Sequence, residues 1–168
     1  MKSTRIRVIF IFVFSFSAAA GAQSARKAEA FTATTIEGKA VDLAALRGKV
    51  VLLTFWSTRC SICQSEIPKL NRLAGEYVGK EVVFLAASAE GEDILKSYLK
   101  DHPFRFRILP NSFGLMLKYE RPDSDGRANI AYPAYYLIDR IGRIQYQDYG
   151  WDKAEPLADA IDKALANR

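Results

Sequence analysis

The sequence predicts an α/β protein in which helices flank a central mixed β-sheet. Apolar runs of strand length alternate with segments of helical spacing through the middle of the chain, and a strand pair with a terminal helix follows. The chain has 168 residues, of which 49% are hydrophobic and 26% are charged. This length and composition suit one folded domain with a sizeable core, and they exclude collagen-like, low-complexity and fully disordered chains.

The expected elements follow one another with short connections. A turn signal at Glu37–Lys39 divides residues 31–46 into a β-hairpin. Continuous apolar runs predict strands that are covered on both faces, and alternating Phe and Arg residues predict one half-exposed strand. Strands are expected at residues 50–55, 82–87, 104–108, 134–138 and 144–149. Helices are expected at residues 63–77, 93–99, 111–119 and 156–166, with a loop at 123–126 and a turn at 139–142.

Residues 1–22 have the three-part layout of a secretory signal peptide. Basic side chains precede an apolar stretch at residues 8–20, and a small-x-small pattern ends at Ala22. Because the apolar stretch is shorter than the roughly 20 residues of a membrane span, we expect cleavage after Ala22, with an uncleaved anchor as the alternative. Residues 23–168 then form a single domain in an oxidising space such as a bacterial periplasm.

The charge and the cysteine count exclude several classes of protein. The formal net charge of +5 falls to +2 without residues 1–22, which hold three basic residues and no acidic one. Since a nucleic-acid-binding protein usually carries a stronger basic stripe, no nucleic-acid partner is expected. The chain has only two cysteines, Cys60 and Cys63, which excludes a disulfide-rich miniprotein and a four-cysteine zinc site.

The run Cys60–Cys63 follows a buried strand and opens a helix. Because residues three apart face the same side of a helix, the two sulfurs can close a disulfide. The sulfur of Cys60 is expected near the helix N-terminus, where unpaired N–H groups favour the negative charge of a thiolate, and Arg59 adds a positive charge beside it. We therefore assign Cys60 as the attacking thiolate and Cys63 as the resolving thiol of a redox pair.

Two other uses of the cysteines are weighed against the redox pair. A structural disulfide is disfavoured because so short a ring constrains the unfolded chain little. A metal site is disfavoured because the two thiols and the single histidine, His102, supply at most three ligands. No cofactor and no metal are therefore expected.

The segment Thr54–Pro68 resembles the active-site segment of exported thioredoxin-like disulfide reductases, the TlpA-like group. Phe31–Gly48 is similar to the N-terminal hairpin of that group, and Ile130–Asp139 is similar to its segment with the cis-proline. The resemblance extends over most of residues 23–168. It implies a thioredoxin-like fold with a β-hairpin before the central sheet, and the activity of a thiol–disulfide oxidoreductase.

The same resemblance implies supporting roles for three residues, and Arg59 is added to them for its positive charge beside Cys60. Pro133 matches the cis-proline, which faces the redox pair and leaves a backbone group free to bind a substrate strand. Tyr132, directly before it, is expected to contact substrate and sulfur, and Arg59 completes the expected substrate-binding set. Glu66 matches an acid close to the redox pair and is expected to take the proton that Cys63 loses. A trans Pro133 and a solvent-facing Glu66 without a role are the alternatives.

The direction of electron flow depends on residues that depart from the family pattern. Arg59 stands where the family usually has Trp before the first cysteine, and Ile62 stands where it often has Pro before the second. Residues between the cysteines help to set the stability of the reduced form. The pair Ser61 and Ile62 does not by itself indicate the direction of electron flow. The resemblance favours reduction.

We therefore expect a periplasmic enzyme that reduces protein disulfides and draws electrons from a membrane thiol donor. The protein itself is expected at the membrane only if residues 1–22 are not cleaved. A thiol peroxidase is the first alternative, in which Ser57 holds the offset of that chemistry's threonine, although the usual proline is missing. A copper-binding module of the same fold is the second, although such modules typically use a wider cysteine spacing.

Overall fold

The computed structural model describes residues 26–120, 125 and 131–167. In chain order, its elements are β1 (Thr32–Thr34), β2 (Ala40–Asp42), a 3-10 helix (Ala44–Leu46), β3 (Val50–Phe55), α1 (Ser61–Glu76), β4 (Val82–Ala87), α2 (Glu92–Asp101), β5 (Arg107–Leu109), α3 (Phe113–Tyr119), β6 (Ala134–Ile138), β7 (Ile144–Tyr149) and α4 (Ala154–Ala166). The expected signal segment lies outside the described residues, as does the loop at 123–126 apart from Asp125. None of the described helices is long and apolar enough to cross a membrane.

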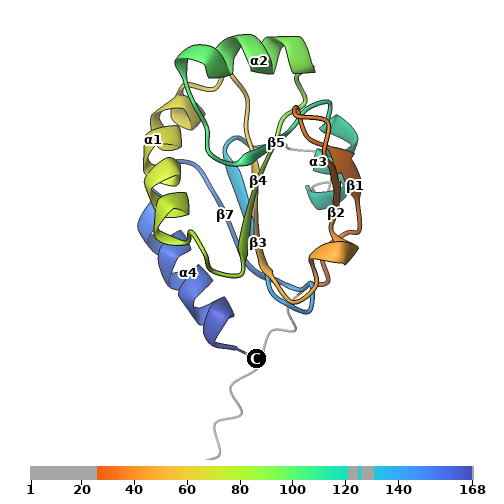
Figure 1. Ribbon diagram of the computed structural model, residues 1–168, viewed down its shortest axis with the longest axis vertical. Helices are drawn as coiled ribbons and strands as arrows, with labels where there is room; N and C mark the ends of the chain where they lie inside the picture. Colours follow the sequence, from red (N-terminus) through yellow and green to blue (C-terminus); the bar gives the residue numbers. More distant parts are fainter. Residues whose placement is uncertain (1–25, 121–124, 126–130, 168) are drawn as a thin grey trace, which may run out of the picture.

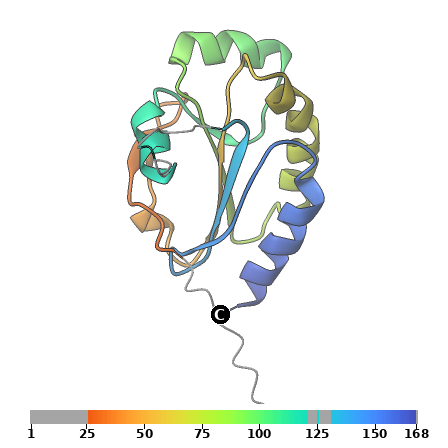
Figure 2. The same ribbon diagram turned by 180° about the vertical axis from the view of Figure 1, so that it is seen from behind.

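Five of the described strands form one mixed sheet in the order β5-β4-β3-β6-β7. Strands β3, β4 and β5 are parallel, whereas β6 is antiparallel to both β3 and β7. Strands β1 and β2 pair separately as an antiparallel hairpin. The helices and the hairpin form layers on this sheet, with α1 and α4 over one face, and α3 and the hairpin over the other (Figures 1 and 2). The expected mixed sheet with flanking helices and an N-terminal hairpin is confirmed.

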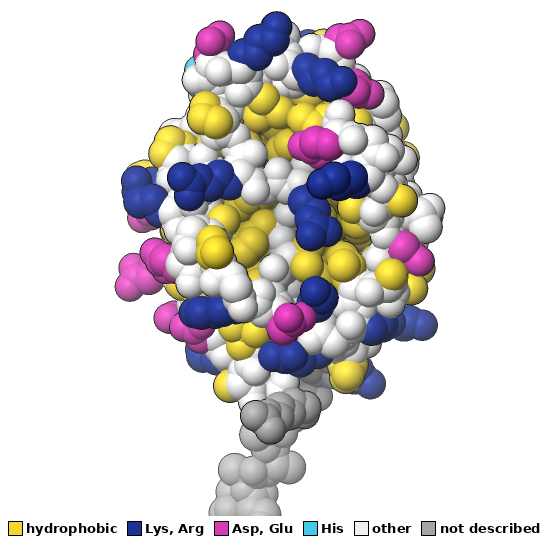
Figure 3. Space-filling view, in the orientation of Figure 1, with side chains coloured by type: hydrophobic (Ala, Val, Ile, Leu, Met, Phe, Trp, Pro, Cys, Tyr) yellow, Lys and Arg dark blue, Asp and Glu magenta, His cyan; other side chains and the backbone are white. Residues whose placement is uncertain are grey.

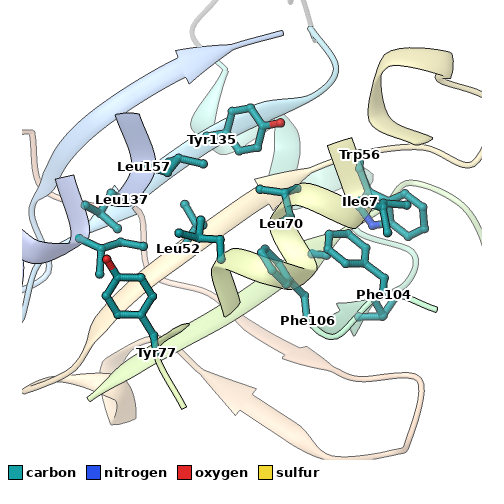
Figure 4. Close-up of a cluster of buried hydrophobic side chains, with 14 of the residues drawn as sticks. Leu52, Trp56, Ile67, Leu70, Tyr77, Phe104, Phe106, Tyr135, Leu137 and Leu157 are labelled. Carbon is teal, nitrogen blue, oxygen red and sulfur yellow. The ribbon is translucent and has the colours of Figure 1, made fainter. Parts of the chain in front are cut away.

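Strand β3 lies at the centre of the sheet because both of its faces are apolar. All six of its residues are buried. Val50 and Leu52 point into the core under α1 and α4, and Val51, Leu53 and Phe55 point into the core under α3 and the hairpin. Figure 4 shows the first core, where side chains from α1 and α4 meet those of the sheet. Each fully buried Leu or Val side chain contributes about 1.5–3 kcal/mol, so both layers are anchored on this strand.

The sequence-based prediction was wrong about the extent of one strand. A strand was expected at residues 104–108, but β5 comprises only Arg107–Leu109 and pairs with the last three residues of β4. Phe104 and Phe106 are buried as expected, and they fill the core under α1 without joining the ladder. The alternation of apolar and charged residues therefore predicted correctly which side chains are buried. It did not predict the length of the strand, because only Arg107–Leu109 run close enough to β4 to pair with it.

One edge of the sheet collects the loops that carry the predicted site. Because β3, β4, β5 and β7 share a direction, their carboxyl ends meet there, beside the first residue of the antiparallel β6. Helix α2 lies across this end of the molecule (Figure 1). The loops after β3, β4 and β7 and the residues before β6 are thus brought together, although they are far apart in the sequence.

Candidate active site

The two cysteines lie where β3 gives way to α1. Cys60 is the N-cap of α1, and its Sγ accepts a hydrogen bond of 3.1 Å from the backbone N–H of Cys63. The two residues form a disulfide with their Cα atoms 5.2 Å apart. Cys60 is partly exposed, whereas Cys63 is only 2% exposed and belongs to the core under α1. An incoming sulfur can therefore reach Cys60 first, and the N-terminal N–H groups of a 16-residue helix favour a thiolate there.

The side chain of Glu66 is fully buried. Its Oε1 pairs with Lys69 Nζ at 2.8 Å, and its Oε2 accepts a hydrogen bond of 3.3 Å from the backbone N–H of Lys153. The hydrogen bond to Glu66 raises the pKa of Lys69, and a second bond to Asp152 adds to this. The alternative of a solvent-facing Glu66 is therefore wrong, because this carboxylate is buried one helical turn beyond Cys63.

Several polar atoms on the core side of the redox pair have no hydrogen-bond partner within the described part of the chain. They are Thr54 Oγ1, Trp56 Nε1 and the hydroxyl of Tyr135. Thr54 and Tyr135 lie opposite each other on β3 and β6. Burial raises the pKa of Tyr135, and the negative charge of Glu66 raises it further. Trp56 packs edge-on against Phe104, as Figure 4 shows, which fits the packing role expected for it.

The peptide bond between Tyr132 and Pro133 is cis, as the resemblance implied. Pro133 is buried directly before β6, and its carbonyl oxygen accepts a hydrogen bond of 2.9 Å from Gly150. The Tyr132 side chain is partly buried and contacts both cores. Its hydroxyl donates to Met116 Sδ at 3.1 Å, so the ring is directed towards α3.

Arg59 extends into solvent, where its side chain is 89% exposed. Its Nε lies 3.8 Å from Oε1 of Glu90, a residue of the loop after β4. Reasoning from the sequence missed Glu90, which is 8% exposed and accepts hydrogen bonds from Ser57, Thr58 and Ser88. The sequence signal for Glu90 is its place just after the parallel strand β4, because Ser57 and Thr58 follow the neighbouring parallel strand β3 and carry hydroxyl groups.

No group of three or more His, Cys, Asp or Glu side chains suited to a metal ion occurs within residues 26–120, 125 and 131–167. His102 stacks on the ring of Tyr98 with the ring centroids 4.4 Å apart. On the face shown in Figure 3, basic and acidic side chains are interspersed.

A family model described as the AhpC/TSA family matches residues 25–147. The chain belongs to the AhpC/TSA family. It is 30% identical over 139 residues to the thiol-disulfide oxidoreductase ResA of Bacillus thuringiensis subsp. konkukian, covering 82% of this chain and 76% of that protein. It is 29% identical over 128 residues to the thioredoxin-like protein YneN of Bacillus subtilis, covering 74% and 71% of the two chains.

Solved structures share the fold of this chain. A thiol:disulfide interchange protein of the thioredoxin family from Chlorobium tepidum superposes with a TM-score of 0.72 at 22% identity, covering 84% of this chain and 97% of that one. StoA from Bacillus subtilis superposes with a TM-score of 0.65 at 23% identity, covering 79% and 96%. These two likenesses show the thioredoxin fold. The paired cysteines and the relatives named ResA identify the chain as a thiol–disulfide oxidoreductase.

Proposed function

We propose that this oxidoreductase reduces disulfides of exported proteins and is itself re-reduced by a membrane thiol donor. The observation that carries the proposal is the unequal burial of the redox pair, with Cys60 partly exposed at a helix N-terminus and Cys63 in the core. The direction is supported by the resemblance of Thr54–Pro68 to exported disulfide reductases. The location outside the cytoplasm is supported by the signal-like residues 1–22, and a mature chain that begins at Gln23 in mass spectrometry is the result expected for it.

The reaction transfers two electrons in two steps. The Cys60 thiolate of the reduced protein attacks one sulfur of the partner disulfide, forms a mixed disulfide, and displaces the other partner sulfur as a thiolate. The Cys63 thiol then loses its proton and attacks Cys60 Sγ. The Cys60–Cys63 disulfide forms, and the second partner sulfur leaves as a thiolate. The partner gains two electrons and the two displaced thiolates are protonated, while the redox pair is oxidised.

Four neighbouring residues support these steps. Glu66 takes the proton of Cys63, because it is a buried carboxylate on the same helix. Pro133 and Tyr132 line the approach of the substrate strand at the edge where β6 begins. Arg59 extends into solvent beside Cys60, where its charge can contact the incoming protein.

A titration against glutathione and an insulin-reduction assay test the proposal. We expect a Cys60–Cys63 midpoint nearer to the roughly −270 mV of thioredoxin than to the roughly −120 mV of a strong periplasmic oxidant. Cys63→Ser should trap a mixed disulfide with insulin through Cys60, and Cys60→Ser should trap none, which makes the two variants matched controls. A midpoint near −120 mV would assign an oxidase instead. Consumption of peroxide faster than reduction of insulin would assign a peroxidase.

A further inference from the structure

Glu90 is a buried carboxylate to which the proposed mechanism gives no role. It lies in the loop between β4 and α2, and it is 8% exposed. Oε1 accepts hydrogen bonds from Ser57 Oγ at 3.1 Å and Thr58 Oγ1 at 2.7 Å. Oε2 accepts from the Thr58 backbone N–H at 2.9 Å and Ser88 Oγ at 3.0 Å. Since an ionised carboxylate offers about four acceptor sites, these donors suit a charged Glu90.

The donors belong mainly to the short loop that delivers Cys60. Residues 56–60 connect β3 to α1, and Glu90 holds two of them from a different loop. The Cys60 backbone N–H donates to the carbonyl oxygen of Ser57 at 3.2 Å and so forms a turn over residues 57–60. Ser57 is also a residue whose side chain is bound by Glu90. From the other side, Gln64 Nε2 donates to the Thr58 carbonyl oxygen at 2.6 Å. The path from Glu90 to the nucleophile thus runs through two consecutive hydrogen bonds.

Glu90 also places a negative charge at this edge of the sheet. Burial opposes its ionisation, but the hydrogen bonds from Thr58, Ser88 and Ser57 outweigh burial and hold the pKa of the carboxyl below its usual value. Its charge reaches the residue before the cis-proline, because it adds to the effect of burial in raising the pKa of Tyr132. Arg59 compensates this charge only weakly, since its side chain is exposed to screening solvent.

We infer that Glu90 is a positioning residue of the redox pair, whose buried carboxylate fixes the loop before Cys60 and opposes the thiolate that Cys60 forms on reduction. The inference rests on the proposed function and deepens it. A nearby negative charge destabilises the thiolate, which exists only in the reduced protein, and leaves the disulfide unaffected. The reduced pair is therefore the better electron donor. The N-terminus of α1 and Arg59 act in the opposite sense.

Glu90→Gln tests the inference, because it removes the charge and nearly preserves the shape. The rate of Cys60 alkylation by iodoacetamide, followed against pH, should show a midpoint at lower pH than in the wild type. The equilibrium with glutathione should shift about tenfold towards the dithiol, which corresponds to about 30 mV. Glu92→Gln is the matched control, because it removes an exposed glutamate two residues further along. It should leave both readouts unchanged.

A Glu90→Gln protein that is less stable but keeps the wild-type alkylation midpoint and glutathione equilibrium would overturn the inference and leave Glu90 a purely structural role. If Glu90→Gln does not fold, Glu90→Asp is the second variant, because it keeps the charge but withdraws the carboxylate from Ser57 and Thr58 by one methylene group. It should move both readouts in the same direction as Glu90→Gln by a smaller amount, and no movement in either would overturn the inference. Neither measurement needs a protein substrate, so failure of the insulin assay would count against the proposed function alone.

Discussion

At the scale of single residues, the site is governed by two buried carboxylates that approach the cysteines from different sides. Glu66 lies on α1 beyond Cys63, and Glu90 contacts the loop before Cys60. Glu66 has a lysine partner at 2.8 Å, and Glu90 is held by hydroxyl and backbone donors. The several fixed donors on Glu90 favour its charged form and suit a positioning role, whereas Glu66, with one ammonium and one backbone partner, is assigned the proton transfer.

Replacing Glu66 by Gln should slow disulfide reduction about a hundredfold at neutral pH, at the lower end of the range for the loss of one general base. The physical reason is that Cys63, which is 2% exposed, then loses the buried carboxylate that is proposed to receive its proton. Single-turnover reduction of insulin, followed as a function of pH, measures the effect. The rate of the variant should recover at alkaline pH, where hydroxide removes the proton.

Glu76→Gln is the control for this experiment, because it changes an exposed glutamate of the same helix. Its pH–rate profile should match that of the wild type. An unchanged profile for Glu66→Gln as well would remove Glu66 from the mechanism.

The sequence predicted the cysteine pair, the buried acid on their helix and the proline beside them, because spacing and a family motif mark them. Glu90 could not be found in the same way. Its partners, Ser57 and Thr58, are more than thirty residues away in the chain and meet it only because β3 and β4 are parallel neighbours. A contact that depends on strand order is invisible until the strand order is known.

At the scale of elements, hydrogen bonds join the end of helix α1 opposite the cysteines to helix α4. The Tyr77 hydroxyl, just beyond the last residue of α1, donates to Asp162 Oδ1 at 3.0 Å and to the Ala158 carbonyl oxygen at 3.1 Å. Figure 4 shows the ring at the border of the core that both helices cover. This contact helps to fix the helix that carries Cys63.

Tyr77→Phe should lower the free energy of unfolding by about 1–2 kcal/mol, because it removes a hydrogen bond to a charged group and leaves its acceptors without a donor. Urea unfolding measures the change. Tyr98→Phe is the matched control, since its buried hydroxyl has no hydrogen-bond partner among the described residues. That variant should stay within about 0.5 kcal/mol of the wild type. A Tyr77→Phe protein as stable as the wild type would mean that packing of the ring, and not the Tyr77 hydroxyl, joins the two helices.

Four strands of the sheet have the bounds that the sequence predicted, and they are β3, β4, β6 and β7. These strands are read correctly because the hydrophobic pattern and the pairing in the sheet cover the same residues. At β5 the two properties separate, since Phe104 is buried by packing while pairing with β4 begins only at Arg107. Helix ends moved by one or two residues for a similar reason, because a cap such as Cys60 is defined by backbone geometry and not by hydrophobic spacing.

At the scale of the whole molecule, the buried phenols set a limit to stability at alkaline pH. Burial raises the pKa of seven tyrosines above the usual value of 10.0, and they are Tyr77, Tyr98, Tyr119, Tyr132, Tyr135, Tyr136 and Tyr146. Above pH 10 the unfolded chain therefore loses phenolic protons that the folded chain keeps. Because the folded state then binds more protons, the free energy of unfolding must fall as the pH rises.

The oxidised protein should accordingly keep its stability up to about pH 9 and lose it steeply above about pH 10, by about 1.4 kcal/mol per pH unit for each phenol that ionises only on unfolding. Urea unfolding at a series of pH values gives the slope, and absorbance at 295 nm shows whether the phenols ionise before or during unfolding. Tyr77→Phe should reduce the slope by the contribution of one phenol, since it removes one of these groups and keeps the ring. If most phenols titrated near pH 10 in a protein that stayed folded, burial would not control them, and the two cores would be more open to water than the structure shows.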